Sequence, residues 1–186
     1  YQTFGKFQFV SSKDDWFHAD LILLWHMNPV YTRIPSAHFI WEARYHGTEI
    51  VSIAPDYNAS TIHSDMWLPV EAGTDAALAL AMCKVIIDDG KVNEPFVKEQ
   101  TDLPLLVRRD NGRFLRASDL EDGGREDQFY FLDAASGEIV PAPRGKLDLD
   151  DVDPSLQGKA EATLMDGSMV EVTPAFEILR PRLGDY

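Results

Sequence analysis

Cysteine is almost absent from this sequence, since Cys83 is the only one among 186 residues. A single thiol can form neither an intrachain disulfide nor a set of thiolate ligands. This excludes a disulfide-stabilised scaffold, a thiolate zinc site and an iron–sulfur cluster built from this chain alone. Cys83 lies in an apolar helical segment, where we expect it to belong to the core. A chain of this length can bury a sizeable core.

Positive charge is scarce as well: 17 lysines and arginines face 31 aspartates and glutamates, for a formal net charge of −14. Nucleic-acid binding needs a basic patch that displaces counterions from phosphates, and an anionic membrane surface would repel such a chain. The apolar share of 45% is typical of globular proteins, but no apolar run is long enough to cross a bilayer. We therefore expect a soluble domain with no nucleic-acid partner and no direct membrane insertion.

Several short functional signatures are missing. Neither GxGxxG nor GxxxxGK[ST] occurs, which disfavours an ordinary NAD site and a P-loop, and HExxH and GxSxG are absent too. The five histidines are scattered, at positions 18, 26, 38, 46 and 63. His63, beside Ser64 and Asp65, could indicate a metal or hydrolase site, but no ligand spacing supports one, so a structural role is expected there. The sequence predicts no catalytic residue and no metal ligand in this chain.

Three apolar segments are each followed by an abrupt change of pattern. Residues 19–25 and 49–54 are typical of buried strands, and 66–70 indicates a shorter third strand. Pro29, Pro35 and Pro55 prevent the first two strands from continuing. If the strands are parallel, their carboxyl ends meet at one sheet edge, where α/β folds bind ligands and where backbone amides favour phosphates.

Helical segments separate and follow these strands. Residues 14–18 indicate a short helix, 36–46 an amphipathic helix that ends at Gly47, and 94–100 a further small helix. Between them, residues 74–89 are apolar around most of the circumference, so we expect a helix buried on more than one side, with Thr74 as its N-cap. The fold class is α/β, with a Rossmann-like parallel sheet and flanking helices.

The pattern changes after residue 103 to short apolar runs, glycine turns and acidic turns. Residues 129–132 and 138–140 predict one hairpin, and 162–164 and 169–172 another. A last helix is expected from Thr173 as cap and Pro174 as first helical residue, through about Leu179. The resulting division is an α/β binding segment at 1–103, a β-rich and loop-rich insertion at 104–173, and the start of a return helix at 174–186.

Some polar residues at the expected sheet edge suit nucleotide binding. Arg33 could clamp a phosphate with Thr32 donating to it, or the pair could be a helix-entry cap and a surface ion pair. Asp56 is placed to accept hydrogen bonds from a ribose. Asp75 could cap its own helix, or it could accept hydrogen bonds from guanine. Tryptophans such as Trp25 are more often core than stacking platforms.

Several segments together resemble the dimethyl sulfoxide reductase superfamily of molybdenum enzymes. They are WHMNP at 25–29, TRIPSAHF at 32–39, EAR at 42–44, APDY at 54–57, PVEAGTDAALALAM at 69–82, EQTDLPLLVR at 99–108 and GRFLR at 112–116. The pattern is similar to the nitrate reductase-like branch. It is most similar there to the group of dimethyl sulfide dehydrogenase, ethylbenzene dehydrogenase and the selenate and (per)chlorate reductases. The resemblance is closest over residues 1–120.

The resemblance implies a segment of a catalytic subunit that holds one half of a bis(molybdopterin guanine dinucleotide) molybdenum cofactor. Carried over residue by residue, the loop from Trp25 to Asn28 and Thr32 would surround the pyrophosphate, Asp56 would meet the ribose or guanosine, and Asp75 would read the guanine. His26 stands where the branch often has glycine. The full candidate set is Trp25, His26, Met27, Asn28, Thr32, Arg33, Pro55, Asp56, Tyr57, Gly73, Thr74 and Asp75.

The resemblance also implies parts that this chain does not contain. The cysteine motif for an iron–sulfur cluster and the aspartate that ligates molybdenum are expected upstream of Tyr1, and a C-terminal barrel domain completes the cofactor site. This segment alone is therefore not expected to be catalytically competent. Expected partners are the remainder of its own subunit and an iron–sulfur beta subunit, and a haem gamma subunit is a further partner that the resemblance allows.

The resemblance favours the periplasm, with the cytoplasm as the alternative. A function of a different class remains open, namely a non-catalytic α/β binding or assembly module that keeps the fold without molybdopterin. The sequence upstream of Tyr1 distinguishes the two. A cysteine motif and a ligating aspartate there favour the enzyme, and a genuine start near Tyr1 favours the module.

Overall fold

The computed structural model describes residues 12–145, 148–149 and 151–185. The chain divides into two compact units, residues 1–76 and 77–186, and each is described by itself. The first carries a parallel sheet with helices, and the second carries helices and antiparallel strands. This mixed architecture confirms the predicted α/β class with an added β-rich region.

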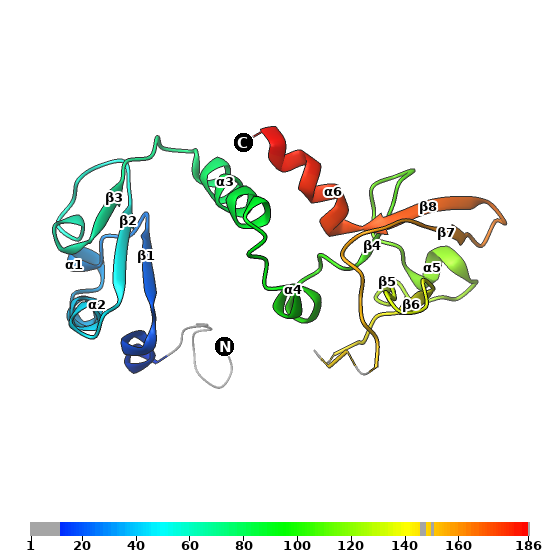
Figure 1. Ribbon diagram of the computed structural model, residues 1–186, viewed down its shortest axis with the longest axis horizontal. Helices are drawn as coiled ribbons and strands as arrows, with labels where there is room; N and C mark the ends of the chain where they lie inside the picture. Colours follow the sequence, from blue (N-terminus) through cyan, green and yellow to red (C-terminus); the bar gives the residue numbers. More distant parts are fainter. Residues whose placement is uncertain (1–11, 146–147, 150, 186) are drawn as a thin grey trace. The chain divides into compact units, whose positions relative to one another are not determined.

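The sheet of the first unit consists of β1 (Leu21–Trp25), β2 (Glu49–Ile53) and β3 (Met66–Leu68), in the order β1-β2-β3 (Figure 1). Both pairings are parallel; Leu23 is in register with Val51, and Val51 with Met66. All of the strands fall within the segments predicted from their apolar runs. Their carboxyl ends therefore meet at one edge of the sheet.

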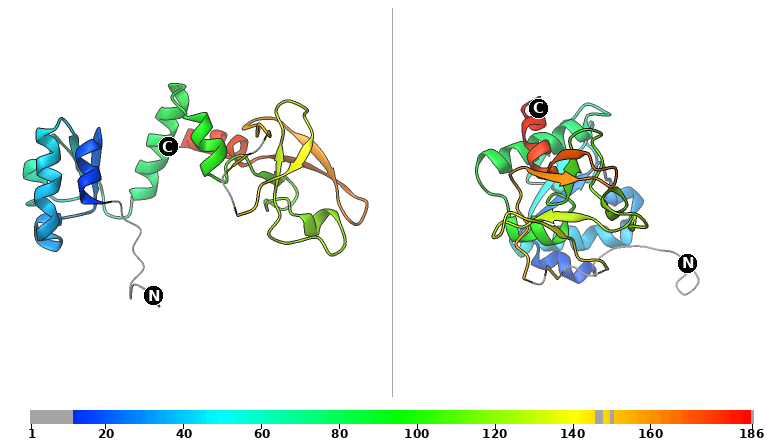
Figure 2. Two further views of the ribbon diagram at one scale, coloured as in Figure 1. Left: turned by 90° about the horizontal axis from the view of Figure 1, so that it is seen from below. Right: turned by 90° about the vertical axis from the view of Figure 1, so that its right-hand side faces the viewer.

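Helices lie on one face of this sheet. They are α1 (Pro29–Thr32) and α2 (Ile34–Tyr45), with η2 (Thr61–His63) in the connector before β3 (Figures 1 and 2). η1 (Lys13–His18) leads into β1, and its Phe17 ring contacts the Phe39 ring of α2. Ile40 of α2 packs with Leu24 and Ile50 in a buried cluster. Leu21 and Leu23 on β1 are 48% and 37% exposed, whereas β2 is buried from Ile50 onward. Among the described strands of this sheet, the central strand β2 is therefore the one that is buried on both faces.

Asp65 ties the start of β3 to its neighbours. Its carboxylate accepts hydrogen bonds from the backbone N–H of Ile50 (2.9 Å) and from Nε of Arg44 (2.8 Å). The Ile50 hydrogen bond, followed by the contribution of Arg44, lowers the pKa of Asp65 below its ordinary value. These contacts favour the charged carboxylate in the folded state.

Replacing Asp65 with asparagine should weaken the acid sensitivity of this chain. Because the folded-state pKa of Asp65 is below the unfolded value, its contribution to stability is present above the unfolded pKa. That contribution is lost as the pH falls through the folded pKa, that is, below about pH 4. We expect the free energy of unfolding of Asp65→Asn, measured with urea from pH 6 downward, to fall less steeply in this range. A slope equal to that of the wild type would contradict the assignment.

The second unit begins with helices. α3 (Asp75–Asp88) starts at the unit boundary, and α4 (Glu94–Gln100) follows, with Asn93 accepting from the backbone N–H of Phe96 at its N-cap. No residue of α3 is buried, and Cys83 is exposed. The predictions that α3 is buried on more than one side and that Cys83 is a core residue are therefore wrong for this chain. Apolar composition leads to burial only where other elements cover the helix, and the described residues cover α3 incompletely.

Within the described residues, the antiparallel strands form two small sheets, both visible in Figure 2. β4 (Leu106–Arg108), β8 (Met169–Pro174) and β7 (Ala160–Thr163) pair in that order, and β5 (Tyr130–Leu132) pairs with β6 (Ile139–Pro141). The two predicted hairpins are confirmed. Between the sheets lies a core made of Leu106, Leu115, Leu132, Ala162, Val170 and Val172.

Two short helices and a final turn complete the second unit: α5 (Ala117–Leu120), α6 (Ala175–Arg182) and η3 (Leu183–Asp185). Thr173 and Pro174 were predicted to begin α6, but both belong to β8, and Pro174 occupies the N-cap position. The pairing of Pro174 with Leu106 extends the strand through these residues, and the Thr173 hydroxyl donates to the Gly158 carbonyl instead of capping the helix.

Candidate functional site

The candidate site is the carboxyl edge of the parallel sheet. The predicted residues lie there in three groups: Trp25, His26, Met27 and Asn28 at and after the end of β1, with Thr32 and Arg33 at the end of α1; Pro55, Asp56 and Tyr57 after β2; and Gly73, Thr74 and Asp75 at and before the start of α3. The topology of the sheet therefore places all three loops along one edge. Which of these residues bind a ligand stays a prediction.

Asp75 joins two of the three loops. Trp25 donates from Nε1 to Oδ1 of Asp75 over 2.6 Å, and Nε2 of His26 lies 2.8 Å from the same oxygen. Oδ2 has no partner among the residues that the structure describes. The carboxylate is therefore engaged by side chains from the β1 loop, and no backbone N–H of α3 donates to it within the described residues. Trp25 is half-buried and acts as a hydrogen-bond donor.

Asn28 connects the β1 loop to the loop after β2. The hydroxyl of Ser60 donates to Oδ1 of Asn28 (2.7 Å) and accepts from the backbone N–H of Val30 (3.2 Å). Ser60 is fully buried, and its own backbone N–H donates to the side chain of Asn58. Nearby, the buried hydroxyls of Ser52 and Thr61 form a hydrogen bond of 3.0 Å. This network holds the first two loops in a fixed relation.

Residues 58–61, which hold the first two loops together, were assigned no functional role from the sequence. Their signal is the spacing of Asn58 before Ser60, because an asparagine side chain commonly accepts from the backbone two residues later. The structure shows this turn, with Oδ1 of Asn58 accepting from the backbone N–H groups of Ser60 and Thr61. What the spacing could not show is that Ser60 reaches back to the β1 loop.

The remaining predicted side chains differ in how they are engaged. The Thr32 hydroxyl donates to the Asn28 carbonyl (3.0 Å) and closes the α1 turn. In this arrangement the hydroxyl proton of Thr32 is already used in a hydrogen bond. Tyr57 makes an edge-on contact with the Trp67 ring, with 5.2 Å between centroids. Arg33 and Asp56 are exposed, and neither side chain has a hydrogen bond or ion pair with another described residue. Within the described part of the chain, the surface ion pair considered for Arg33 is therefore not formed.

The chemistry of this edge suits binding rather than acid–base catalysis. Arg33 offers a planar cation that can bind phosphate oxygens, while Asp56 and Oδ2 of Asp75 offer acceptors. The chain turns toward α3 at Gly73, which has a φ of +91°. Residues with a side chain adopt this conformation only at an energetic cost. A nucleotide presents phosphate oxygens together with donors on its ribose and base. The exposed groups of the edge are complementary to both.

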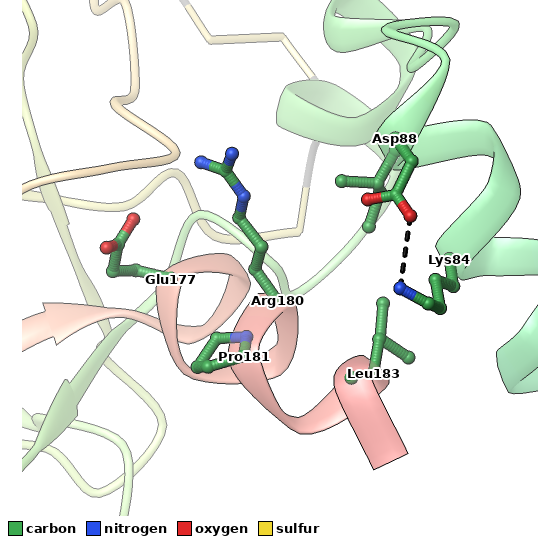
Figure 3. A pocket seen from close by; sticks show the side chains of 8 residues that line it. Lys84, Asp88, Glu177, Arg180, Pro181 and Leu183 are labelled. Carbon is green, nitrogen blue, oxygen red and sulfur yellow. Dashed lines mark hydrogen bonds and ion pairs between the residues drawn. The ribbon is translucent and has the colours of Figure 1, made fainter. Parts of the chain in front are cut away.

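Hollows also occur in the second unit, and one of them is shown in Figure 3. Lys84 and Asp88 of α3 and Glu177 and Arg180 of α6 line it. Nζ of Lys84 and the carboxylate of Asp88 form an ion pair of 3.1 Å. Positive and negative groups are therefore balanced in this hollow, which gives no preference for a ligand of either charge.

Among the described residues, no group of three or more histidine, cysteine, aspartate or glutamate side chains is arranged to hold a metal ion. No described helix combines the length and the apolar character that spanning a bilayer requires.

Most of this chain matches a known protein family. The family model for molybdopterin oxidoreductases matches residues 2–175. The chain is 47% identical to the alpha subunit of dimethylsulfide dehydrogenase from Rhodovulum sulfidophilum over 181 residues, covering 94% of this chain and 19% of that subunit. It is 43% identical to the alpha subunit of perchlorate reductase from Dechloromonas aromatica (strain RCB), covering 98% and 22%.

A third relative is the alpha subunit of chlorate reductase from Ideonella dechloratans, with 45% identity over 95% of this chain and 20% of that subunit. The chain thus spans about a fifth of the length of these relatives. The resemblance inferred from the sequence motifs is confirmed, including the similarity to the dimethyl sulfide dehydrogenase and (per)chlorate reductase group. On this evidence, the chain belongs to the molybdopterin oxidoreductase family.

Proposed function

We propose that this chain is the segment of a molybdenum oxidoreductase catalytic subunit that holds one half of a bis(molybdopterin guanine dinucleotide) cofactor. The observation that supports this most directly is the set of groups without partners among the described residues at the sheet edge: Arg33, Asp56 and Oδ2 of Asp75. They line the edge at which α/β folds bind nucleotides. Membership of the molybdopterin oxidoreductase family supports a molybdopterin cofactor, and the guanine dinucleotide form is part of the proposal.

The donors and acceptors present fit the two ends of the nucleotide. Arg33 would bind a phosphate oxygen through its guanidinium group, and Asp56 would accept hydrogen bonds from ribose hydroxyls. Oδ2 of Asp75 would accept from guanine, whose Watson–Crick edge carries N–H donors. When bound, the cofactor supplies redox chemistry at molybdenum for oxygen-atom transfer or hydroxylation. The contribution of this chain is to hold and orient the nucleotide.

The relatives support the proposed assembly. Their names describe alpha subunits, and this chain spans about a fifth of each of them. We therefore propose that the rest of the same subunit, with an iron–sulfur cluster in its N-terminal part, surrounds this segment. An iron–sulfur beta subunit and a haem gamma subunit are its proposed partners. The periplasm is the proposed compartment, with the cytoplasm as the alternative, because the chain is similar to the alpha subunits of dimethylsulfide dehydrogenase and of the perchlorate and chlorate reductases.

Replacing Arg33 with alanine tests the phosphate contact. Hydrogen bonds to charged groups contribute about 1.5–3 kcal/mol each, so nucleotide binding should weaken roughly tenfold to a hundredfold. The measurement is the guanine nucleotide released per mole of purified subunit that carries this segment. Lys13→Ala is the matched control, because it removes a cation from η1, which precedes β1. Equal nucleotide contents in Arg33→Ala and Lys13→Ala would contradict the assignment.

A further inference from the structure

His26 has an unusual backbone conformation. Among the described residues other than glycine, it alone has a positive φ, at +50°. L-residues adopt this region at an energetic cost, and glycine adopts it freely. Strain of this kind persists where the surroundings determine the conformation, and it is frequent at ligand-binding sites. If the chain needed only a turn here, glycine would serve better, so the imidazole side chain itself requires an explanation.

The contacts of His26 provide that explanation. Its backbone N–H donates to the carbonyl of Ile53 (2.8 Å), which fixes the loop against β2, and its Nε2 lies 2.8 Å from Oδ1 of Asp75. The adjacent Trp25 donates to the same oxygen over 2.6 Å. Two neighbouring side chains therefore occupy one carboxylate oxygen from the side of β1 and leave Oδ2 without a partner among the described residues.

The segment before Asp75 contains little else to fix it. Glu71, Ala72 and Gly73 are exposed, and the hydrogen bonds that Thr74 makes within the described residues, from its backbone N–H and its hydroxyl, both end at the nearby carbonyl of Glu71. These bonds are local and do not attach the segment to the sheet. The contacts of Trp25 and His26 with Asp75 span about fifty residues of sequence and provide that attachment.

We propose that Trp25 and His26 are positioning residues for guanine recognition: together they orient the Asp75 carboxylate so that Oδ2 faces the base. This inference rests on the proposed function, because it assumes that a guanine nucleotide occupies this edge. A carboxylate is only an acceptor, and guanine offers two kinds of N–H donor on its Watson–Crick edge, whereas adenine offers one donor beside an acceptor nitrogen. Holding the carboxylate in place before binding reduces the cost of ordering it on binding.

The test uses the mature subunit with His26→Gly, Trp25→Phe and Asp75→Asn, singly and in combination. The two readouts are the guanine nucleotide retained per mole of protein after dialysis and the midpoint of thermal unfolding. We expect His26→Gly to lower nucleotide retention about three- to tenfold. The unfolding midpoint should stay unchanged or rise, because glycine adopts the positive φ at this position without strain. Trp25→Phe, which keeps an aromatic ring but removes the N–H, should lower retention by a similar factor.

The combined variants separate positioning from a general structural role. If Trp25 and His26 act through Asp75, adding either substitution to Asp75→Asn should cause little further loss. If His26→Gly or Trp25→Phe lowered nucleotide retention by the same factor in the Asp75→Asn background as in the wild type, the proposal would be overturned. His26→Asn serves as a second variant, because asparagine tolerates a positive φ but has a shorter side chain. A folded His26→Asn with wild-type retention would also overturn it.

The outcomes also distinguish this inference from the function on which it rests. Wild-type retention in His26→Gly and Trp25→Phe, together with a loss in Asp75→Asn, would refute the positioning role and leave the proposed function standing. No guanine nucleotide in the mature wild-type subunit would refute both.

Discussion

Replacing Asp75 with asparagine in the mature subunit should lower its guanine nucleotide content about tenfold to a hundredfold. The substitution keeps the size of the side chain and an oxygen that Trp25 can donate to, but it replaces a charged acceptor with an amide. One hydrogen bond to a charged group contributes about 1.5–3 kcal/mol, and an N–H facing the donors of guanine adds repulsion. The measurement is acid release and chromatographic quantification of guanine nucleotide, with molybdenum determined on the same sample.

Asp88→Asn is the matched control for this prediction. Asp88 is the last residue of the same helix, is exposed, and pairs with Lys84 instead of with the β1 loop. Its variant should retain the wild-type nucleotide and molybdenum contents. If Asp75→Asn also retained them, Asp75 would not be a guanine-binding residue, whatever its contacts with Trp25 and His26.

Replacing Gly124 with alanine should severely destabilise the second unit. A Cβ atom at this position would lie 2.2 Å from the carbonyl oxygen of Ala117 and 2.8 Å from the backbone nitrogen of Ser118. These are backbone atoms at the start of α5, so neither can rotate away as a flexible side chain would. We expect a loss of about 3 kcal/mol or more and a decrease of roughly 10 °C or more in the unfolding midpoint, measured by circular dichroism.

Gly184→Ala is the control for steric overlap. A Cβ atom at Gly184 would meet no heavy atom within 4 Å, and its φ is outside the left-handed region. The unfolding midpoint of this variant should stay close to that of the wild type, because surface substitutions usually change stability by about 0.5 kcal/mol or less. A Gly124→Ala variant as stable as Gly184→Ala would show that the segment around α5 accommodates the methyl group.

The sequence predicted where the three loops meet better than it predicted the contacts among them. Apolar runs that end in proline and glycine breaks were enough to place three loops at one sheet edge, because parallel strands share a carboxyl edge. The hydrogen bonds from Trp25 and His26 to Asp75 join residues about fifty positions apart. No local pattern encodes such a contact, and the same holds for the hydrogen bond from Ser60 to Asn28.

The errors in the predicted fold have similar causes. The apolar composition of α3 indicated burial, yet composition does not say which element covers a helix, and none of its residues is buried here. Thr173 and Pro174 correctly indicated that a helix starts nearby, but not the residue at which it starts. The pairing of Pro174 with Leu106 on a distant strand extended β8 and moved the helix start to Ala175. The predicted division at residues 103 and 173 stays a prediction.

The glycine pair at 123 and 124 illustrates a third limit. A glycine pair is typical of a turn, and Gly123 has the positive φ, +73°, that glycine adopts freely at the third position of the turn closed by the Gly124 N–H and the Glu121 carbonyl. Gly124 is needed for a different reason, because its Cα lies against the backbone of α5. From the sequence alone, a glycine needed for its positive φ could not be told from a glycine needed because another backbone segment lies close to it.

The measurement that tests the central claim most directly is the pterin and metal content of the mature subunit that carries this segment. Elemental analysis gives the molybdenum content, and oxidative release gives the fluorescent pterin together with its nucleotide. The proposed function predicts two pterin units, each with guanine nucleotide, per molybdenum atom. Properly matured protein with no molybdenum or tungsten and no pterin would contradict it. The chain would then have to be interpreted as an α/β binding or assembly module that keeps the family fold without the cofactor.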